Sequence, residues 1–474
     1  MPLKQFTIDF RELGKEKSFR YDVDFLNFQN DFLAELFYSF NDLFSFASGN
    51  EVDVEKLDDD FFYSEIGNVS KEGDVEPVKL NFNDRKEEEE NYYKKIEKGD
   101  IIKAKESEIL LSKVRPNLKK YVFIDRDNKD YFYTSAFIHL VPKKLNKILY
   151  YSLRTIFYQN LIAISRQGKG YPTLKENDFL YLKFDKKIID KLSVKQGQVV
   201  AQIEPIEKKI KELKNQITPA QEIINKVFAR EFKFDLEKFE ELKKIKNYYL
   251  DLSAFANNKD VRQSVKFHRE AGIFVTEQLK NIADKKIKNY LTEPIVLGKG
   301  VSPSNYDDNG DYFYISMANI KNWKFGSEDA RLVSKEYSDK NQNKTVTKGD
   351  ILIARSGEGT IGKVALIDDE DLQGIFADFT MRIRLENYNP LFAYYYFRTD
   401  YFQYLIEVNK KGLGNNTNIF PSQIQEFTMI DISLKDQQKI VDEIKAELDK
   451  QEEMKQKIEA KRNKIGEIIE KATI

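Results

Sequence analysis

The chain contains a long internal duplication. The thirteen residues from Tyr150 to Ile162 recur 244 positions later as Tyr394 to Ile406, and seven of the thirteen are identical. Two shorter matches flank this segment: Lys98–Ile101 with Lys348–Ile351, and Gly168–Gly170 with Gly412–Gly414. This period is much longer than the roughly 20–50 residues of solenoid repeats. The sequence therefore predicts two similar domains in tandem and excludes a repeat array.

Each copy ends in a charged segment whose apolar residues follow heptad spacing, over about 194–228 and 436–472. The predicted seam positions are Val199, Ile203, Ile206, Ile210, Leu213 and Ile217 in the first segment, and Ile440, Ile444, Leu448, Ile458 and Ile465 in the second. We expect two long α-helices that pair as an antiparallel coiled coil. Pro205 and Pro219 are expected to kink or restart the first helix. The alternative is that each helix lies on its own domain.

The globular parts have mixed patterns, so we expect an α+β fold for each. Strands are predicted at Ile101–Ala104, Tyr121–Ile124 and Phe137–Val141, and helices over 25–46 and 145–165. The order of globule, helix, globule, helix predicts boundaries at 1–185, 186–257, 258–432 and 433–474.

Composition narrows the class of protein. A chain of 474 residues with 41% hydrophobic content can form about three domain-sized units. It has no cysteine and only two histidines, His139 and His268, which excludes disulfide scaffolds and thiolate zinc sites. No stretch of about 18 apolar residues occurs, and the first residues lack the order of a signal peptide. We expect a cytoplasmic protein with no membrane segment.

No motif for catalysis is evident. Residues 357–363 fit two glycine-rich nucleotide-binding patterns, but Val364 stands where a phosphate loop needs Ser or Thr, and a β-type segment follows where a helix is needed. A glycine-rich turn between two strands is the favoured interpretation, and a nucleotide-binding enzyme is the weaker alternative. His139 lies in an apolar strand and is predicted to be a packed core residue. The chain is predicted not to be an enzyme.

Candidate DNA-binding residues lie on loops of both copies. Arg, Lys and Asn side chains hold phosphates or read base edges, although any one of them can also be an ordinary solvated residue. The candidates are Lys113, Arg115, Lys119, Lys120, Arg166, Lys169 and Tyr171 in the first copy, and Arg355, Ser356, Lys363, Lys410, Lys411, Asn415, Asn416, Thr417 and Asn418 in the second.

Several sequence segments occur in an order that resembles that of a known family. The segments are Asp311–Ile320, Lys348–Gly357, Gly374–Phe379, Phe420–Ile424 and Ile432–Val441. With the duplicated architecture, they are similar to the DNA-specificity (S) subunit of a type I restriction-modification enzyme. The first copy departs from this pattern, because Leu110–Pro116 replaces the glycine-rich loop and residues 50–92 are acidic.

The resemblance implies separate roles for the globules, the helices and the partner subunits. Each globule would be a target-recognition domain that reads one half of a split, asymmetric DNA site, and the paired helices would fix the gap between the halves. Two adenine methyltransferase subunits, and a translocating nuclease, would dock on this chain in a host-defence system. S-adenosylmethionine, ATP and magnesium would bind only to those partners. The competing hypothesis is a coiled-coil scaffold that binds proteins and not DNA.

Overall fold

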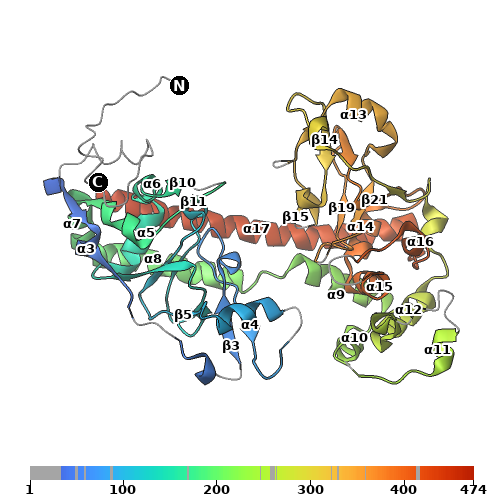
Figure 1. Cartoon of the computed structure of the whole chain (residues 1–474), viewed down its shortest axis with the longest axis horizontal. Helices are drawn as coiled ribbons and strands as arrows, with labels where there is room; N and C mark the ends of the chain where they lie inside the picture. The colour runs from blue at the N-terminus through green and yellow to red at the C-terminus, as the bar shows by residue number, and fades with distance from the viewer. Residues whose placement is uncertain are drawn as a thin grey trace. The chain divides into compact units, whose positions relative to one another are not determined.

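The computed structural model describes residues 34–48, 52–57, 60–85, 89–167, 170–245, 247–256, 262, 264–321, 323–327, 330–357, 359–412 and 417–474. The chain forms two compact units (Figure 1). Unit 1 comprises Met1–Asn215 with Gln456–Ile474, and unit 2 comprises Gln216–Lys455. The four domain boundaries given above stay predictions.

Two four-stranded sheets form the centre of unit 1. The first sheet is antiparallel, with the order β2-β9-β6-β7, and the second has the order β4-β3-β8-β5, in which β3 and β8 are parallel. The strands are β2 (Phe44–Phe46), β3 (Phe61–Ser64), β4 (Val78–Leu80), β5 (Ile102–Lys103), β6 (Ile109–Ser112), β7 (Tyr121–Phe123), β8 (Phe132–Tyr133) and β9 (Phe137–Pro142). The three strands predicted from the sequence pattern are confirmed as β5, β7 and β9.

Unit 2 repeats this topology, except that its second sheet has three strands and an isolated bridge between Thr345 and Ile375 stands in place of the fourth. Its first sheet has the order β13-β21-β18-β19, and its second has the order β17-β14-β20, in which β14 and β20 are again parallel. The strands are β13 (Val296–Leu297), β14 (Tyr312–Ile315), β17 (Leu332–Val333), β18 (Ile351–Ala354), β19 (Val364–Leu366), β20 (Gly374–Phe376) and β21 (Thr380–Ile383). The matching strand orders confirm two similar α+β domains.

The duplicated thirteen-residue segment forms a pair of helices in each unit. The pairs are α5 (Asn146–Arg154) with α6 (Tyr158–Ala163), and α14 (Pro390–Arg398) with α15 (Asp400–Asn409). A single helix over 145–165 is thus wrong. The segment forms two helices because the N–H groups of Thr155 and Phe157 both donate to the carbonyl of Ser152, which ends α5. In unit 2, Thr399 caps the second helix with its side chain.

The predicted helix over 25–46 is also wrong where the structure describes it, and residues 25–33 lie outside the described residues. This region forms η1 (Ala34–Leu36), β1 (Phe37–Ser39), α3 (Phe40–Leu43) and β2. Strand β1 pairs with β12 (Lys183–Asp185), and Phe40 packs edge-on against Phe179. Tertiary contacts of the aromatic side chains therefore override the helical spacing.

The heptad segments form α8 (Gln196–Lys214), α9 (Ala220–Phe232) and α17 (Leu434–Thr473). Pro205 is accommodated inside α8, and a new helix starts after Pro219. Eight predicted seam residues are buried and three are half-buried. The buried ones are Val199, Ile203, Ile210, Leu213, Ile440, Ile444, Ile458 and Ile465, and the half-buried ones are Ile206, Ile217 and Leu448. Each buried side chain contributes roughly 1.5–3 kcal/mol of hydrophobic stabilisation.

The helix pairing is antiparallel within each unit. In unit 1, the Lys191 ammonium donates to the carbonyls of Thr473 and Ile474 at the end of α17. In unit 2, the Thr218 amide donates to the Gln451 side chain at 2.8 Å. Further along, Arg230 donates to Glu443 at 2.6 Å. In unit 2 the partner numbers on α17 fall from 451 to 443 as those of the first segment rise from 218 to 230, which confirms the predicted antiparallel coiled coil.

The remaining elements complete the two units. In unit 2, the ring of Tyr401 on α15 lies between Phe234 and Phe239, with centroid distances of 4.3 and 5.0 Å. This contact ties α10 to the duplicated helix pair, and α12 packs separately against α15. Other elements are α4 (Glu90–Glu97), α7 (Lys186–Val194), α10 (Leu236–Lys243), α11 (Leu252–Ala256), α12 (Glu270–Ile282), α13 (Lys335–Lys340), α16 (Pro421–Ile424), β10 (Arg166–Gln167), β11 (Pro172–Thr173), β15 (Ile320–Lys321) and β16 (Lys324–Phe325).

Candidate nucleic-acid interface

Three loops of unit 2 meet where strand β18 ends. The amide of Arg355, the residue after β18, donates to the carbonyl of Phe379 at 2.9 Å, and its own carbonyl accepts from Ile419 at 2.9 Å. Ser356 then forms an antiparallel bridge with Asn418. We call the described residues of loops 355–363, 377–379 and 410–418 the unit 2 edge. Three segments far apart in sequence are thus held in one hydrogen-bonded frame.

The same frame exists in unit 1 with different side chains. The amide of Lys113, after β6, donates to Ala136 at 3.0 Å, and its carbonyl accepts from Leu174 at 2.8 Å. Val114 forms an antiparallel bridge with Thr173. We call the described residues of loops 113–120, 134–136 and 166–174 the unit 1 edge. Lys113, Val114, Ala136 and Thr173 therefore correspond to Arg355, Ser356, Phe379 and Asn418.

The glycine-rich segment of the unit 2 edge is a turn between two paired strands. Strand β19 follows it and pairs antiparallel with β18, so no helix N-terminus is available for a phosphate. The backbone of Gly362 has φ +85°, and a Cβ there would lie 2.8 Å from the Gln403 side chain. Glycine is required because the turn passes close to α15. The turn predicted from the sequence is confirmed.

The unit 2 edge presents cations that have no internal partner. Within the described residues, no carboxylate forms an ion pair with Arg355, Lys363 or Lys299. Lys299 follows β13, and its amide donates to the Phe376 carbonyl at 3.0 Å, beside loop 377–379. Sequence reasoning missed Lys299 because only the pairing of β13 with β21 brings it here. By contrast, Lys410 is 15% exposed and pairs with Glu407 at 2.6 Å.

Two buried polar atoms at this edge also lack partners. In the described part of the chain, Arg355 Nε and Thr417 Oγ1 are buried without a hydrogen bond. Such atoms are uncommon in native proteins. Lys411 and Asn418 exchange two main-chain hydrogen bonds of 2.7 Å, which fixes the base of the loop between them.

Three candidates lie outside the described residues, namely Lys169, Asn415 and Asn416.

Most candidate cations of the unit 1 edge bind internal acceptors. Lys113 donates to the Ser135 carbonyl at 2.7 Å, Lys119 to Arg154 at 3.0 Å, and Lys120 to Ile66 at 2.9 Å. Arg166 pairs at 2.7 Å with the fully buried carboxylate of Asp178. Burial, together with the charge of Arg154, lowers the pKa of Lys119. These side chains hold the loops in place.

Arg115 and Tyr171 form the exposed part of the unit 1 edge. The guanidinium of Arg115 lies 5.2 Å from the Tyr171 ring centroid, and the ring is 41% exposed. The Arg115 amide donates to Pro172 at 2.8 Å, which anchors a left-handed backbone with φ +51°. A cation stacked on an aromatic ring is preorganised to contact phosphate or a base.

Comparison with known families decides the nature of unit 2. Residues 294–462 match the family described as the type I restriction modification DNA specificity domain. This segment is a type I DNA specificity domain. The specificity domain contains β13 to β21 and every loop of the unit 2 edge. The predicted family is confirmed for these residues. It is a family of DNA-recognition domains, which agrees with the expectation that the chain is a non-catalytic subunit.

Other comparisons give weaker similarities. No curated protein matches the chain. The structure is similar to a chain from work on complex assembly and conformational transition of the type I R-M system, with 14% identity, a TM-score of 0.39, and coverage of 92% of this chain and 97% of the other. It is also similar to the HsdS subunit from Thermoanaerobacter tengcongensis (13%, 0.30, 92% and 95%) and to the type I S subunit from M. genitalium (12%, 0.38, 91% and 95%).

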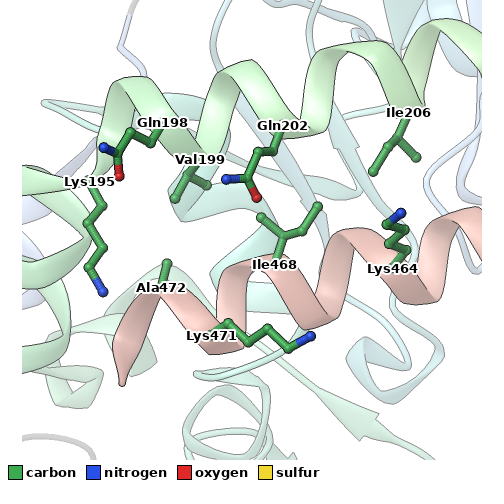
Figure 2. A pocket seen from close by; sticks show the side chains of 9 residues that line it. All are labelled: Lys195, Gln198, Val199, Gln202, Ile206, Lys464, Ile468, Lys471 and Ala472. Carbon is green, nitrogen blue, oxygen red and sulfur yellow. The ribbon is translucent and has the colours of Figure 1, made fainter.

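A groove runs along the helix pair of unit 1. Its volume is about 560 Å³. Figure 2 shows Lys195 and Ala472 at one end and Ile206 and Lys464 at the other, with Ile468 between the helices. The other lining residues are Gln198, Val199, Gln202 and Lys471. The groove is lined by both apolar and polar side chains, and three lysines flank it.

His139, outside the two edges, has a structural role. His139 is buried, and its Nε2 lies 2.7 Å from Glu108 Oε2. The prediction of a packed core histidine is therefore confirmed. Among the described residues, no group of three or more metal-ligating side chains comes together. No helix in the described ranges has the length and apolar character needed to cross a membrane.

Proposed function

We propose that the chain is the DNA-specificity subunit of a type I restriction-modification enzyme and reads a bipartite, asymmetric DNA site. One observation carries this proposal. Two edges share one main-chain frame but present different side chains, and one edge belongs to the specificity domain. A shared frame would dock similarly on two stretches of DNA, and different side chains would read different bases. The gap between the half-sites would be fixed by the helix pair.

The partners in this proposal are adenine methyltransferase and nuclease-translocase subunits. The lysine-flanked groove of unit 1 offers an apolar floor and a basic rim, which suits an acidic segment of a methyltransferase subunit. S-adenosylmethionine, ATP and magnesium would bind to those partners, since catalysis would take place there. The complex would work in the cytoplasm.

The proposed function is tested by expressing the chain with the methyltransferase encoded beside it and mapping methylated adenines by long-read sequencing. The expected result is a split motif with a fixed gap that disappears when this gene is deleted. Arg355→Glu should abolish methylation of that motif. The matched control is Lys280→Glu, an exposed lysine on α12 outside the unit 2 edge, which should leave the motif intact. An unchanged motif in Arg355→Glu would contradict the proposal.

The second candidate function is a coiled-coil scaffold that binds proteins without reading DNA. The groove of unit 1 supports a docking role in both candidate functions, because a docking surface does not require a DNA interface. Ile468→Asp in the groove should disrupt copurification with the methyltransferase, whereas Lys445→Glu, an exposed site on the same helix, should not. If the double variant Arg355→Glu and Lys363→Glu kept every interaction and every methylated site, this second function would replace the first.

A further inference from the structure

Phe379 is an exposed aromatic residue on the unit 2 edge. It occupies the tight turn between β20 and β21, and it is 55% exposed although both neighbouring strands are buried. A single exposed apolar side chain is common on protein surfaces and needs no explanation by itself. What distinguishes Phe379 is its position, because its carbonyl accepts the Arg355 amide that builds the frame.

The turn that carries Phe379 is held rigidly. The Thr380 amide and hydroxyl both bond to the Ala377 carbonyl, at 2.9 and 2.6 Å. On the other side, the Gly298 amide donates to Thr380 at 3.1 Å. A Cβ at Gly298 would lie 2.0 Å from the Ala377 oxygen, so only glycine permits this approach. The ring is therefore presented to solvent from a fixed backbone, on the edge that carries Arg355, Lys363 and Lys299, which form no ion pair with a described residue.

The equivalent residue of unit 1 carries no such group. Ala136 accepts the Lys113 amide in the same frame, and its side chain is a methyl group. The frame therefore does not require an aromatic residue at this position. Full burial of a side chain of this size contributes roughly 1.5–3 kcal/mol, and the exposed ring of Phe379 lacks part of that contribution. A ligand that covers the ring would gain it.

We infer that Phe379 is a specificity-determining residue that packs against a thymine methyl group in the half-site read by unit 2. This inference rests on the proposed function. The neighbouring cations Arg355, Lys363 and Lys299 would hold phosphates or guanine, and none of them can recognise an apolar group. Thymine is the base that displays a methyl group in the major groove, and phenylalanine is among the side chains that contact it.

The test uses the complex with its methyltransferase subunits and duplexes that contain its own methylation motif. Each thymine of the unit 2 half-site is replaced in turn by deoxyuridine, which removes only the methyl group. At one position, the native complex should lose affinity about fourfold, the value for one buried methyl-sized group. Phe379→Ala should weaken binding to the thymine duplex and should no longer respond to deoxyuridine, whereas Phe379→Leu should retain part of the response.

The control variant is Ile273→Ala, which removes an exposed apolar side chain of similar accessibility from α12. It should bind both duplexes as the native complex does. Equal deoxyuridine responses in the native and Phe379→Ala complexes, or no response at any thymine, would overturn the role of Phe379. Failure of the native complex to prefer its methylated motif over unrelated DNA would instead overturn the proposed function.

Discussion

The two edges share a main-chain frame but use their cations in different ways. In unit 1, Lys113, Lys119 and Lys120 donate to main-chain carbonyls, and Arg166 neutralises a buried carboxylate. In unit 2, Arg355 and Lys363 have no internal ion pair within the described residues. Cations that stabilise a loop and cations that could bind phosphate therefore occupy equivalent places. The fold therefore fixes the main-chain frame of the two edges but not the interactions of the side chains that the frame carries.

The largest expected effect tests the structural role of the unit 1 cations. Arg166→Ala leaves the buried Asp178 carboxylate without its charged partner, so unit 1 should lose about 3 kcal/mol of stability. Hydrogen exchange of segments 113–120 and 166–178 should accelerate, while unit 2 stays protected. Arg230→Ala removes a pair that is exposed to solvent and should cost less than about 1 kcal/mol. Equal effects of the two changes would mean that Arg166 does not hold the unit 1 edge.

The next effect compares equivalent positions directly. Arg355→Ala should weaken binding to the methylated motif by about 2 kcal/mol, or roughly 30-fold, because it removes a base or phosphate contact. Lys113→Ala should weaken binding much less, since the Lys113 ammonium already bonds to Ser135. Fluorescence anisotropy with the labelled duplex measures both. A loss for Lys113→Ala as large as that for Arg355→Ala would show that the two edges use their cations alike.

Local spacing made part of this structure predictable. The duplication, the two heptad helices and the glycine turn at 357–363 follow from residues near one another in sequence. The different roles of Lys113 and Arg355 do not, because the acceptor of Lys113 is Ser135 on another loop. Phe379 and Lys299 were missed for the same reason. Nothing in their own segments indicates that the Phe379 carbonyl accepts from Arg355 after β18, or that Lys299 after β13 bonds to Phe376.

The duplicated helices offer a further contrast, at their first residues. The Asn389 side chain caps α14 by accepting from the amides of Leu391 and Phe392, whereas Leu145 begins α5 with φ +55° and no side-chain cap. Asn389→Ala should therefore destabilise α14 by about 1 kcal/mol. Asn389→Asp keeps an acceptor at the cap and should restore most of that stability. Hydrogen exchange of 390–398 is the measurement, and equal losses in both variants would exclude capping as the cause.

The smallest expected effect distinguishes phosphate contacts from structural lysines. The logarithm of the binding constant falls with the logarithm of salt concentration by about 0.9 for each phosphate that a protein neutralises. Lys363→Ala should therefore reduce this slope by about 0.9 and weaken binding only a few-fold. Lys120→Ala should leave the slope unchanged, because its ammonium already bonds to the Ile66 carbonyl at 2.9 Å. Titrations at several salt concentrations separate the two. A lower slope for Lys120→Ala would mean that the unit 1 edge releases its lysines when DNA binds, and the contrast between the edges would then hold only for the chain without DNA.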